Sequence, residues 1–215
     1  MDSKPSVQHA DAWRHSPTRR PLVCRLWSEP DFGMRIIAGT LKGRRLDAPS
    51  WPGLRPTSDK LRETLFNVLG PRVVGARVLD GCAGTGAVGI EALSRGAEHV
   101  TFVDRDRRAT DLIAGNLARC GMVERYAIIR ADCGSGAATG PQPLFDLVFL
   151  DPPYDTDAAV LADAVARSLA PGGLLIVEHA RRSSAPARIR TLERSREVVS
   201  GDSVLSFYAT PEAAE

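Results

Sequence analysis

Short apolar runs alternate with helix-like segments between residues 77 and 178. The apolar runs predict strands at residues 77–80, 99–103, 126–130, 147–150 and 174–178. Between them, apolar residues at helical spacing predict helices at residues 86–95, 106–120 and 157–169. Repeating strand–helix units with nearly continuous apolar strands are typical of a parallel sheet covered by helices on both faces. The pattern therefore predicts an α/β fold.

The C-terminal part of the chain departs from this alternation. Pro171-Gly172-Gly173 predicts a turn that leads into the strand at 174–178. Residues 186–194 and 197–209 predict two more strands around Ser200-Gly201-Asp202. Strands joined by a short turn pair antiparallel. The whole sheet is thus expected to have seven strands, mostly parallel, with an antiparallel C-terminal edge.

The segment before the sheet predicts a smaller unit. Two short extended pieces, 35–39 and 43–46, contain glycines between them and predict a small hairpin. Thr57-Ser58-Asp59 provides a helix N-cap, and Gly70-Pro71 ends that helix. Residues 1–33 have no apolar periodicity and predict a poorly ordered extension, so that Met34 is a candidate start. The expected organisation is an extension at 1–33, a hairpin and helix at 34–70, and a larger domain at 71–215.

Composition excludes several classes of protein. The 215 residues are 43% hydrophobic and 25% charged, which is ordinary for a globular domain. Apolar runs fall short of the ~18 residues that span a bilayer, and residues 1–33 lack the apolar segment of a secretory signal. The four cysteines show no Cys-x-x-Cys spacing, which argues against a zinc ribbon or a disulfide scaffold. We therefore expect a cytoplasmic protein without a metal.

Basic residues concentrate in one part of the chain. Although the net charge is +2, seven basic and two acidic residues between positions 35 and 62 give a local charge of +5. A cluster of this kind is either a solvated face or a surface that binds phosphates. The candidate RNA-binding residues of this segment are Arg35, Lys42, Arg44, Arg45, Arg55, Thr57, Lys60 and Arg62.

The most informative motif is Asp151-Pro152-Pro153-Tyr154, directly after the apolar run 147–150. The Asp151 carboxylate and the Pro152 carbonyl can accept hydrogen bonds from an exocyclic amine, and the prolines fix the backbone that carries them. The Tyr154 ring offers a face on which a flat base can stack. The motif predicts a catalytic turn formed by these four residues, and the alternative is a proline-rich turn that closes a strand.

The turn after the first predicted strand, Asp80-Gly81-Cys82-Ala83-Gly84-Thr85-Gly86, is a candidate cofactor site. Glycines let the backbone approach a ligand at the amino end of a helix. Gly84, Gly86 and Gly89 also fit G-x-G-x-x-G, with Asp104 about 20 residues further on. A dinucleotide such as NAD is therefore one candidate ligand.

Acidic residues at three predicted strand ends favour a different ligand. Asp80, Asp104 and Asp132 end or follow successive strands, so they should meet at the carboxyl edge of the sheet. A pyrophosphate disfavours carboxylates, whereas S-adenosylmethionine carries a sulfonium and an ammonium that carboxylates attract. We expect Asp80 near the methionine part, Asp104 on the ribose and Asp132 near the adenine amine. The candidate cofactor-binding residues are Asp80, Gly81, Cys82, Ala83, Gly84, Thr85, Gly86, Asp104, Arg105, Asp132 and Cys133.

Together these motifs resemble one family, the bacterial small-subunit ribosomal RNA guanine-N2 methyltransferases, over roughly residues 34–208. The motifs that carry the resemblance are Met34-Arg35-Ile36-Ile37-Ala38-Gly39, Gly53-Leu54-Arg55-Pro56-Thr57, Asp59, Arg62-Glu63-Thr64-Leu65-Phe66-Asn67, Leu79-Asp80, Ala83-Gly84-Thr85-Gly86, Glu91-Ala92-Leu93-Ser94-Arg95-Gly96 and Asp151-Pro152-Pro153-Tyr154. The amino-terminal motifs are the most restrictive. The sequence departs from the family at Cys82, where phenylalanine is common nearby, and in the Gly- and Ala-rich loop 134–143.

The resemblance implies a Rossmann-like class I methyltransferase fold with a small N-terminal hairpin and helix. It also implies methyl transfer from S-adenosylmethionine to the exocyclic N2 of a guanine in 16S rRNA, with the small ribosomal subunit or an assembly intermediate as partner. We expect a monomer that binds neither membrane nor metal. Three alternatives stay open: a DNA adenine-N6 or protein-glutamine methyltransferase, an NAD-dependent oxidoreductase, and an RNA-binding assembly factor without activity.

Overall fold

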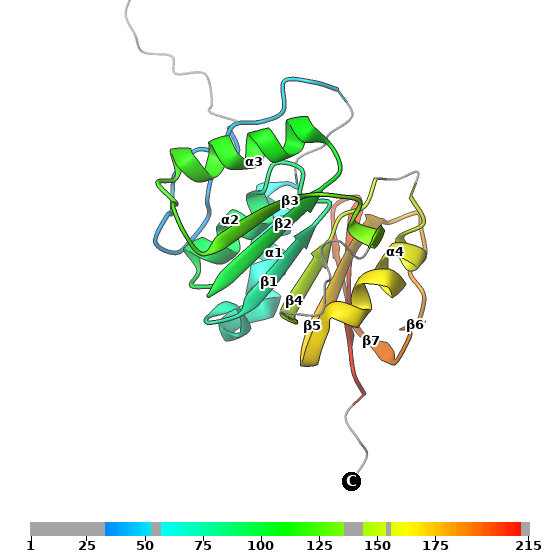
Figure 1. The fold of residues 1–215 in the computed structure, drawn as a ribbon. Helices are drawn as coiled ribbons and strands as arrows, with labels where there is room; N and C mark the ends of the chain where they lie inside the picture. Colours follow the sequence, from blue (N-terminus) through cyan, green and yellow to red (C-terminus); the bar gives the residue numbers. More distant parts are fainter. Residues whose placement is uncertain (1–32, 53–56, 136–143, 154–155, 212–215) are drawn as a thin grey trace, which may run out of the picture. The chain divides into compact units, whose positions relative to one another are not determined.

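The computed structural model describes residues 33–52, 57–135, 144–153 and 156–211. They lie in one compact unit, Gly33–Glu215. Within these residues, one sheet has eight strands in the order β3-β2-β1-β4-β5-β8-β7-β6 (Figure 1). The strands are β1 (Arg77–Gly81), β2 (His99–Asp104), β3 (Tyr126–Arg130), β4 (Phe145–Leu150), β5 (Leu169–Ala180), β6 (Arg188–Ile189), β7 (Leu192–Ser200) and β8 (Ser203–Ala209). The helices are α1 (Asp59–Leu69), α2 (Ala87–Ser94), α3 (Arg107–Arg119) and α4 (Ala158–Val165), with short 3-10 turns η1 (Gly70–Val73), η2 (Cys133–Ser135) and η3 (Ala166–Ser168).

The first five strands of the sheet are parallel, as the alternating pattern predicts. Gly81 at the end of β1 is level with Val103 of β2 and Leu150 of β4. The carboxyl ends of these strands therefore meet at one edge, which is where α/β folds bind ligands. The expectation of a mostly parallel sheet with an antiparallel C-terminal edge is confirmed, because β5 pairs with β8, and β8 with β7, antiparallel.

The boundaries at the C-terminal edge differ from the prediction. Instead of strands at 186–194 and 197–209, β7 runs to Ser200 and β8 starts at Ser203, so the hairpin turn is at Gly201-Asp202. Residues 188–189 form the separate strand β6. The sheet in the described residues therefore has eight strands, where seven were predicted. Arg190, with φ 53°, turns the chain between β6 and β7, and the apolar pattern does not signal this.

Helix α4 is shorter, and β5 longer, than predicted. Pro171-Gly172-Gly173 lies inside β5 rather than before it. Leu169 pairs with Phe145 and Leu174 with Leu147, so β5 has extra residues in an irregularity between these pairs. Gly172 has φ 76°, a conformation that glycine adopts without strain. Proline and glycine therefore mark a bulge in this strand.

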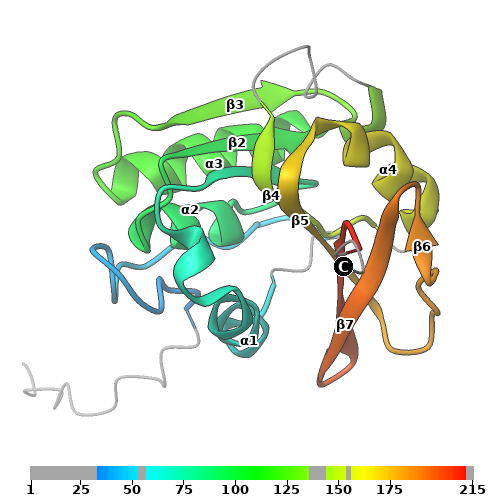
Figure 2. The same cartoon turned by 90° about the horizontal axis from the view of Figure 1, so that it is seen from below.

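Alternation along the strands divides the core into two layers. Residues such as Phe102, Phe149 and Ile176 pack with α1, α2 and α3 on one face of the sheet. Their neighbours Val103, Leu150 and Val177 pack with α4 on the other face (Figure 2). Helices on both faces are the expected arrangement. The central strands are buried on both sides, which leaves the sheet's carboxyl edge as the place for a site.

The segment 34–52 and α1 pack on the same core as the sheet. Met34, Ile36 and Leu46 belong to the buried cluster beneath α2 and α3. The expected hairpin is a glycine-rich loop closed by one antiparallel bridge, between Arg35 and Arg45. Helix α1 begins after Ser58, whose Oγ accepts the Leu61 N–H at 3.2 Å, and ends before Gly70 as predicted.

No helix in the described residues is long and apolar enough to cross a membrane.

Candidate active site

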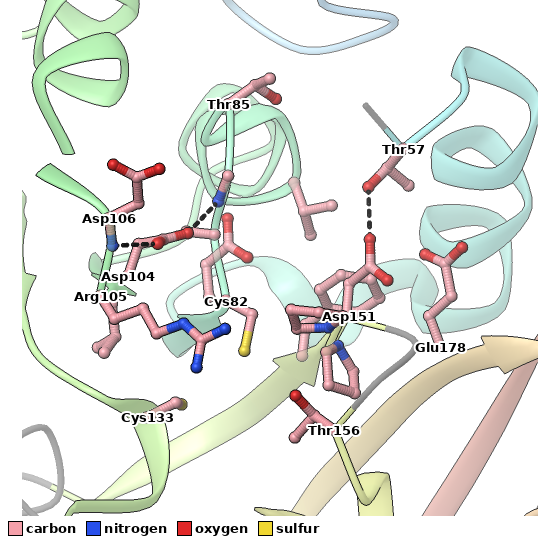
Figure 3. Close-up of a pocket in the computed structure, with 18 of the residues that line it drawn as sticks. Thr57, Cys82, Thr85, Asp104, Arg105, Asp106, Cys133, Asp151, Thr156 and Glu178 are labelled. Carbon is pink, nitrogen blue, oxygen red and sulfur yellow. Dashed lines mark hydrogen bonds between the residues drawn. The ribbon is translucent and has the colours of Figure 1, made fainter. Parts of the chain in front are cut away.

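A cavity of about 600 Å³ opens at the carboxyl edge of β1, β2, β4 and β5 (Figure 3). Predicted residues that line it are Thr57, Asp80, Cys82, Ala83, Gly84, Thr85, Asp104, Arg105, Asp132, Cys133, Asp151, Pro152 and Pro153. The fold brings them together from five separate segments: a residue just before α1 and the ends of β1, β2, β3 and β4 with the turns that follow them. This volume is typical of pockets for small ligands, about 300–1,000 Å³.

Glycines shape the loop between β1 and α2. Gly84 and Gly86 have φ values of 56° and 73°, and Gly86 is the residue that caps α2. A Cβ on Gly81 would lie 2.5 Å from the Leu150 side chain and 2.7 Å from the Cys133 Sγ. Gly81 and Gly86 do not line the cavity themselves. They let the neighbouring residues of the loop reach it.

Asp104 is held at the end of β2 by two backbone amides. Its Oδ2 accepts the Gly84 N–H at 2.9 Å and its Oδ1 accepts the Asp106 N–H at 2.9 Å. The carboxylate thus ties the glycine loop to the start of α3 and is fixed in orientation. Each oxygen retains a lone pair, so the group can also accept hydrogen bonds from a ligand.

Asp80 is buried at the end of β1. Its Oδ2 accepts the Gly89 N–H at 2.8 Å, which joins the strand to α2. Burial raises the pKa of Asp80 to about 7; the Gly89 hydrogen bond opposes this shift and the charge of Asp104 adds to it. A cation in the cavity would stabilise the ionised carboxylate.

Several uncharged residues line the cavity near Arg105, whose side chain extends toward Cys82 and Cys133 (Figure 3). Cys82, with φ 58°, and Cys133 line it together with Val103, Ala131 and Leu161. A hydrogen bond with Cys133 and burial raise the pKa of the Cys82 thiol, so it stays neutral. At the rim, the Asp132 Oδ1 accepts the Gly134 N–H at 2.8 Å. These residues combine apolar contact with an acceptor at the rim.

Asp151 follows β4 and faces the same cavity. Its Oδ2 accepts a hydrogen bond from the Thr57 hydroxyl at 3.4 Å. Burial, then the charges of Glu178 and Asp80, raise the pKa of Asp151 well above its usual range. Pro152 is buried and Pro153 is exposed, and both line the cavity. Tyr154, the last residue of the motif, lies outside the described residues.

The basic segment separates into exposed and buried groups. Arg35, Lys42, Arg44, Arg45 and Lys60 are exposed, as a phosphate-binding face requires, while Arg55 lies outside the described residues. Thr57 lies at the cavity beside Asp151 rather than among the exposed cations.

The prediction that Arg62 binds RNA is wrong, because its side chain is 0% exposed. Its Nη2 donates to Asp59 Oδ1 at 2.6 Å and to the Arg35 carbonyl at 2.8 Å. Its Nη1 lies 3.6 Å from Glu91 Oε2 in α2. Arg62 therefore joins α1 and the amino-terminal segment to the helix that starts at the glycine loop.

Glu91 completes this buried network. Its carboxylate accepts the Ile37 N–H at 2.7 Å, the Ala38 N–H at 2.9 Å and the Arg95 Nε–H at 2.7 Å. The side chain of Glu91 is fully buried. A buried carboxylate with this many donors fixes the amino-terminal segment against α2.

Several cavity residues were not identified from the sequence, notably Trp51, Asp106, Arg108 and Glu178. Glu178 follows the apolar run 174–177, so the strand-end rule that identified Asp80 and Asp104 could have found it. The Trp51–Arg108 pair, 5.1 Å from guanidinium carbon to ring centre, joins residues far apart in sequence and had no local signal.

Comparisons with known proteins agree with this geometry. Ribosomal RNA small subunit methyltransferase D of Haemophilus influenzae is 39% identical over 150 residues, which are 67% of this chain and 78% of that protein. The solved structure of Escherichia coli yhhF has a TM-score of 0.72 at 34% identity and covers 83% of this chain and 98% of its own.

A T. thermophilus 16S rRNA N2 methyltransferase, solved with AdoMet and guanosine, has a TM-score of 0.62 at 19% identity and covers 75% of this chain and 45% of its own. At that identity the match bears on the fold alone, which is the Rossmann-like class I methyltransferase fold. The family model described as Conserved hypothetical protein 95 matches residues 34–209, nearly all of the described unit. The chain therefore belongs to this family, and the resemblance to small-subunit rRNA methyltransferases is confirmed.

Proposed function

We propose that this protein transfers a methyl group from S-adenosylmethionine to the exocyclic N2 of a guanine in 16S rRNA. One observation carries the proposal. A single cavity contains the glycine loop, the acidic ends of β1 and β2, and the Asp151-Pro152-Pro153 turn. A cofactor and a planar amine can therefore meet there. The H. influenzae relative, named for the small-subunit rRNA, supports the choice of substrate.

The carboxylates that line the cavity fit S-adenosylmethionine as a ligand. Asp104, held by two amides, is positioned to accept from ribose hydroxyls, and Asp80 to attract the cationic methionine part. The Cys82 and Cys133 side chains offer contacts for the adenine ring, with Asp132 as an acceptor for its amine. When bound, this cofactor supplies a methyl group activated by a positive sulfur.

Asp151 and Pro152 act on the amine of the substrate. The guanine N2 is a poor nucleophile because its lone pair is delocalised into the ring, so orientation contributes much of the rate. The Asp151 carboxylate and the Pro152 carbonyl accept its two N–H bonds and direct the lone pair towards the methyl group. With the cofactor bound, the C–N bond would form as the methyl–sulfur bond breaks and its electron pair goes to sulfur. The raised pKa makes the ionised Asp151 a stronger base for the proton that N2 loses.

The exposed cations of the amino-terminal segment hold the RNA backbone. Arg35, Arg44 and Arg45 belong to the same compact unit as the cavity. Phosphate contacts give affinity and orientation rather than sequence information. Glu91 and Arg62 fix this segment against α2, so an RNA held there has a defined position relative to the cofactor loop. Thr57, which lines the cavity, and Arg55, which lies outside the described residues, remain proposed RNA contacts.

A labelled-methyl assay tests the proposal. Small ribosomal subunits from cells lacking the gene, duplex DNA and a protein acceptor are incubated separately with labelled S-adenosylmethionine. We expect label in the subunits alone, recovered as N2-methylguanosine after digestion. Label in DNA or protein, or S-adenosylmethionine binding without any transfer, would contradict the proposed function. Asp111→Ala, which changes an exposed aspartate of α3, is the matched control for active-site aspartate variants.

A further inference from the structure

Glu178 lies beside Asp151 in the cavity, although the methyl-transfer steps above do not use it. Leu150 of β4 pairs in parallel register with Val177 of β5, so Asp151 and Glu178 are the next residues on neighbouring strands. Both line the same cavity together with Thr57 and Pro152. Figure 3 shows the two carboxyl groups extending side by side from their strands.

Two neighbouring carboxyl groups in a partly buried cavity are costly for the folded protein. The charge of Glu178 and a hydrogen bond between the two side chains are among the causes that raise the pKa of Asp151. A hydrogen bond between two carboxyl groups requires a proton on one of them, so the pair shares a proton. Titratable groups that shift each other's pKa in a cleft are common at ligand sites. A ligand that presents two adjacent hydrogen-bond donors would satisfy both groups at once.

Guanine presents such a pair of donors. Its N2 amine and its N1–H are neighbours on one edge of the base, whereas adenine and cytosine have an unprotonated ring nitrogen next to their amine. A carboxylate next to the group that holds the amine would accept from guanine N1–H. The same carboxylate would repel the lone pair of an adenine or cytosine ring nitrogen.

We propose that Glu178 accepts the N1–H of the target base and selects guanine over other bases with an exocyclic amine. This inference rests on the proposed function and adds the residue that determines its base specificity. Asp151 and Pro152 hold the amine that reacts, and Glu178 reads the atom beside it. The site thereby rejects a base that offers an amine but no adjacent N–H, since the mismatch leaves a carboxylate facing a lone pair.

A base analogue tests the assignment directly. 2,6-Diaminopurine keeps the 2-amine of guanine but has no hydrogen on N1. It is placed at the methylated position by ligating a synthetic oligonucleotide into 16S rRNA, which is then reconstituted into small subunits. Rates of methyl transfer to guanine and diaminopurine subunits are compared for the wild type, Glu178→Gln and Glu98→Gln. Glu98 is exposed next to the amino end of β2, away from the cavity, so Glu98→Gln is a control for the same change.

For the wild type we expect guanine to be preferred by roughly 10- to 100-fold in kcat/KM, the range of one good base contact. Glutamine can accept from N1–H or donate to a bare N1. Glu178→Gln should therefore reduce this preference to within a few-fold, with an unchanged Kd for S-adenosylmethionine. Glu98→Gln should behave like the wild type.

Two results would overturn the assignment while leaving the proposed function intact. One is a wild-type enzyme that methylates both bases equally, which needs no variant to fold. The other is an unchanged preference in Glu178→Gln. A wild-type enzyme that leaves guanine subunits unmethylated would instead refute the proposed function, and the inference with it.

Discussion

The carboxyl edge of the sheet and the amino-terminal segment both concentrate charge, but they do so with opposite sign and burial. Asp80, Asp104 and Asp151 line a cavity, where low solvent access raises the pKa of two of them. Arg44 and Arg45 are exposed. Buried carboxyl groups suit a cationic cofactor and a nucleobase that donates hydrogen bonds. Exposed arginines suit a polyanion such as RNA. Arg62 belongs to the same basic segment of the sequence but is buried, so position in that segment does not decide whether an arginine is exposed.

The strongest test of this contrast is removal of the buried arginine. Arg62→Ala removes the buried cation between Asp59 and Glu91 and leaves Arg95 as the cation beside Glu91. Loss of one member of a buried ion pair costs about 3–5 kcal/mol. Arg44→Ala should change the free energy of unfolding by less than about 0.5 kcal/mol, because the side chain is exposed. Urea denaturation of both variants measures the difference. Equal stabilities would remove the distinction between the buried and exposed arginines.

Loss of Asp151 should affect chemistry and spare cofactor binding. Asp151→Ala removes the acceptor that orients the amine, and we expect kcat to fall by about 10²- to 10⁴-fold. Calorimetric titration should give a Kd for S-adenosylmethionine close to that of the wild type. Asp111→Ala should retain full activity. An active Asp151→Ala enzyme would exclude the proposed role.

Loss of two exposed cations should affect RNA binding alone. For the double variant Arg44→Ala and Arg45→Ala, the slope of log Kd for subunit RNA against log salt should decrease by about 1 to 2, since each lost phosphate contact reduces counterion release. Cofactor affinity should stay unchanged. If S-adenosylmethionine binding weakened equally, the basic face and the cavity would not be separate sites.

The smallest expected effect is a pH dependence of cofactor binding. Asp80 has a pKa of about 7, so it is mostly neutral below that pH and ionised above it. Ionisation adds attraction for the cationic cofactor, and S-adenosylmethionine should therefore bind more tightly as pH rises through 7. Isothermal titration between pH 6 and pH 8 measures the trend. Asp80→Asn should flatten it, and a wild-type affinity that weakens with rising pH would refute the sign.

The sequence predicts those parts of the site whose structure depends on residues close together in the chain. Apolar runs followed by aspartate identify Asp80, Asp104 and Asp151, because parallel strands must end at one edge. Glycines at 84 and 86 mark the loop through their positive φ values. At these positions the residue type itself limits the backbone conformation, so the loop can be predicted from a single sequence.

The parts that the sequence does not predict depend on contacts between distant segments. Arg62 is one helical turn from exposed residues, and its burial depends on Glu91 in another helix. The bulge at Pro171-Gly172-Gly173 depends on pairing with β4. Asn116, buried in α3, joins the Asp47 backbone to the Thr85 carbonyl with no local motif. In each case tertiary packing decides what local patterns leave open.

The most direct test of the central claim is a count of N2-methylguanosine in 16S rRNA from cells lacking this gene. We predict that mass spectrometry of the digested rRNA finds one such nucleoside fewer per molecule than in wild-type cells. Expression of the wild-type protein should restore it, and expression of Asp151→Ala should not. Unchanged N2-methylguanosine in the deletion strain, or restoration by Asp151→Ala, would contradict the account.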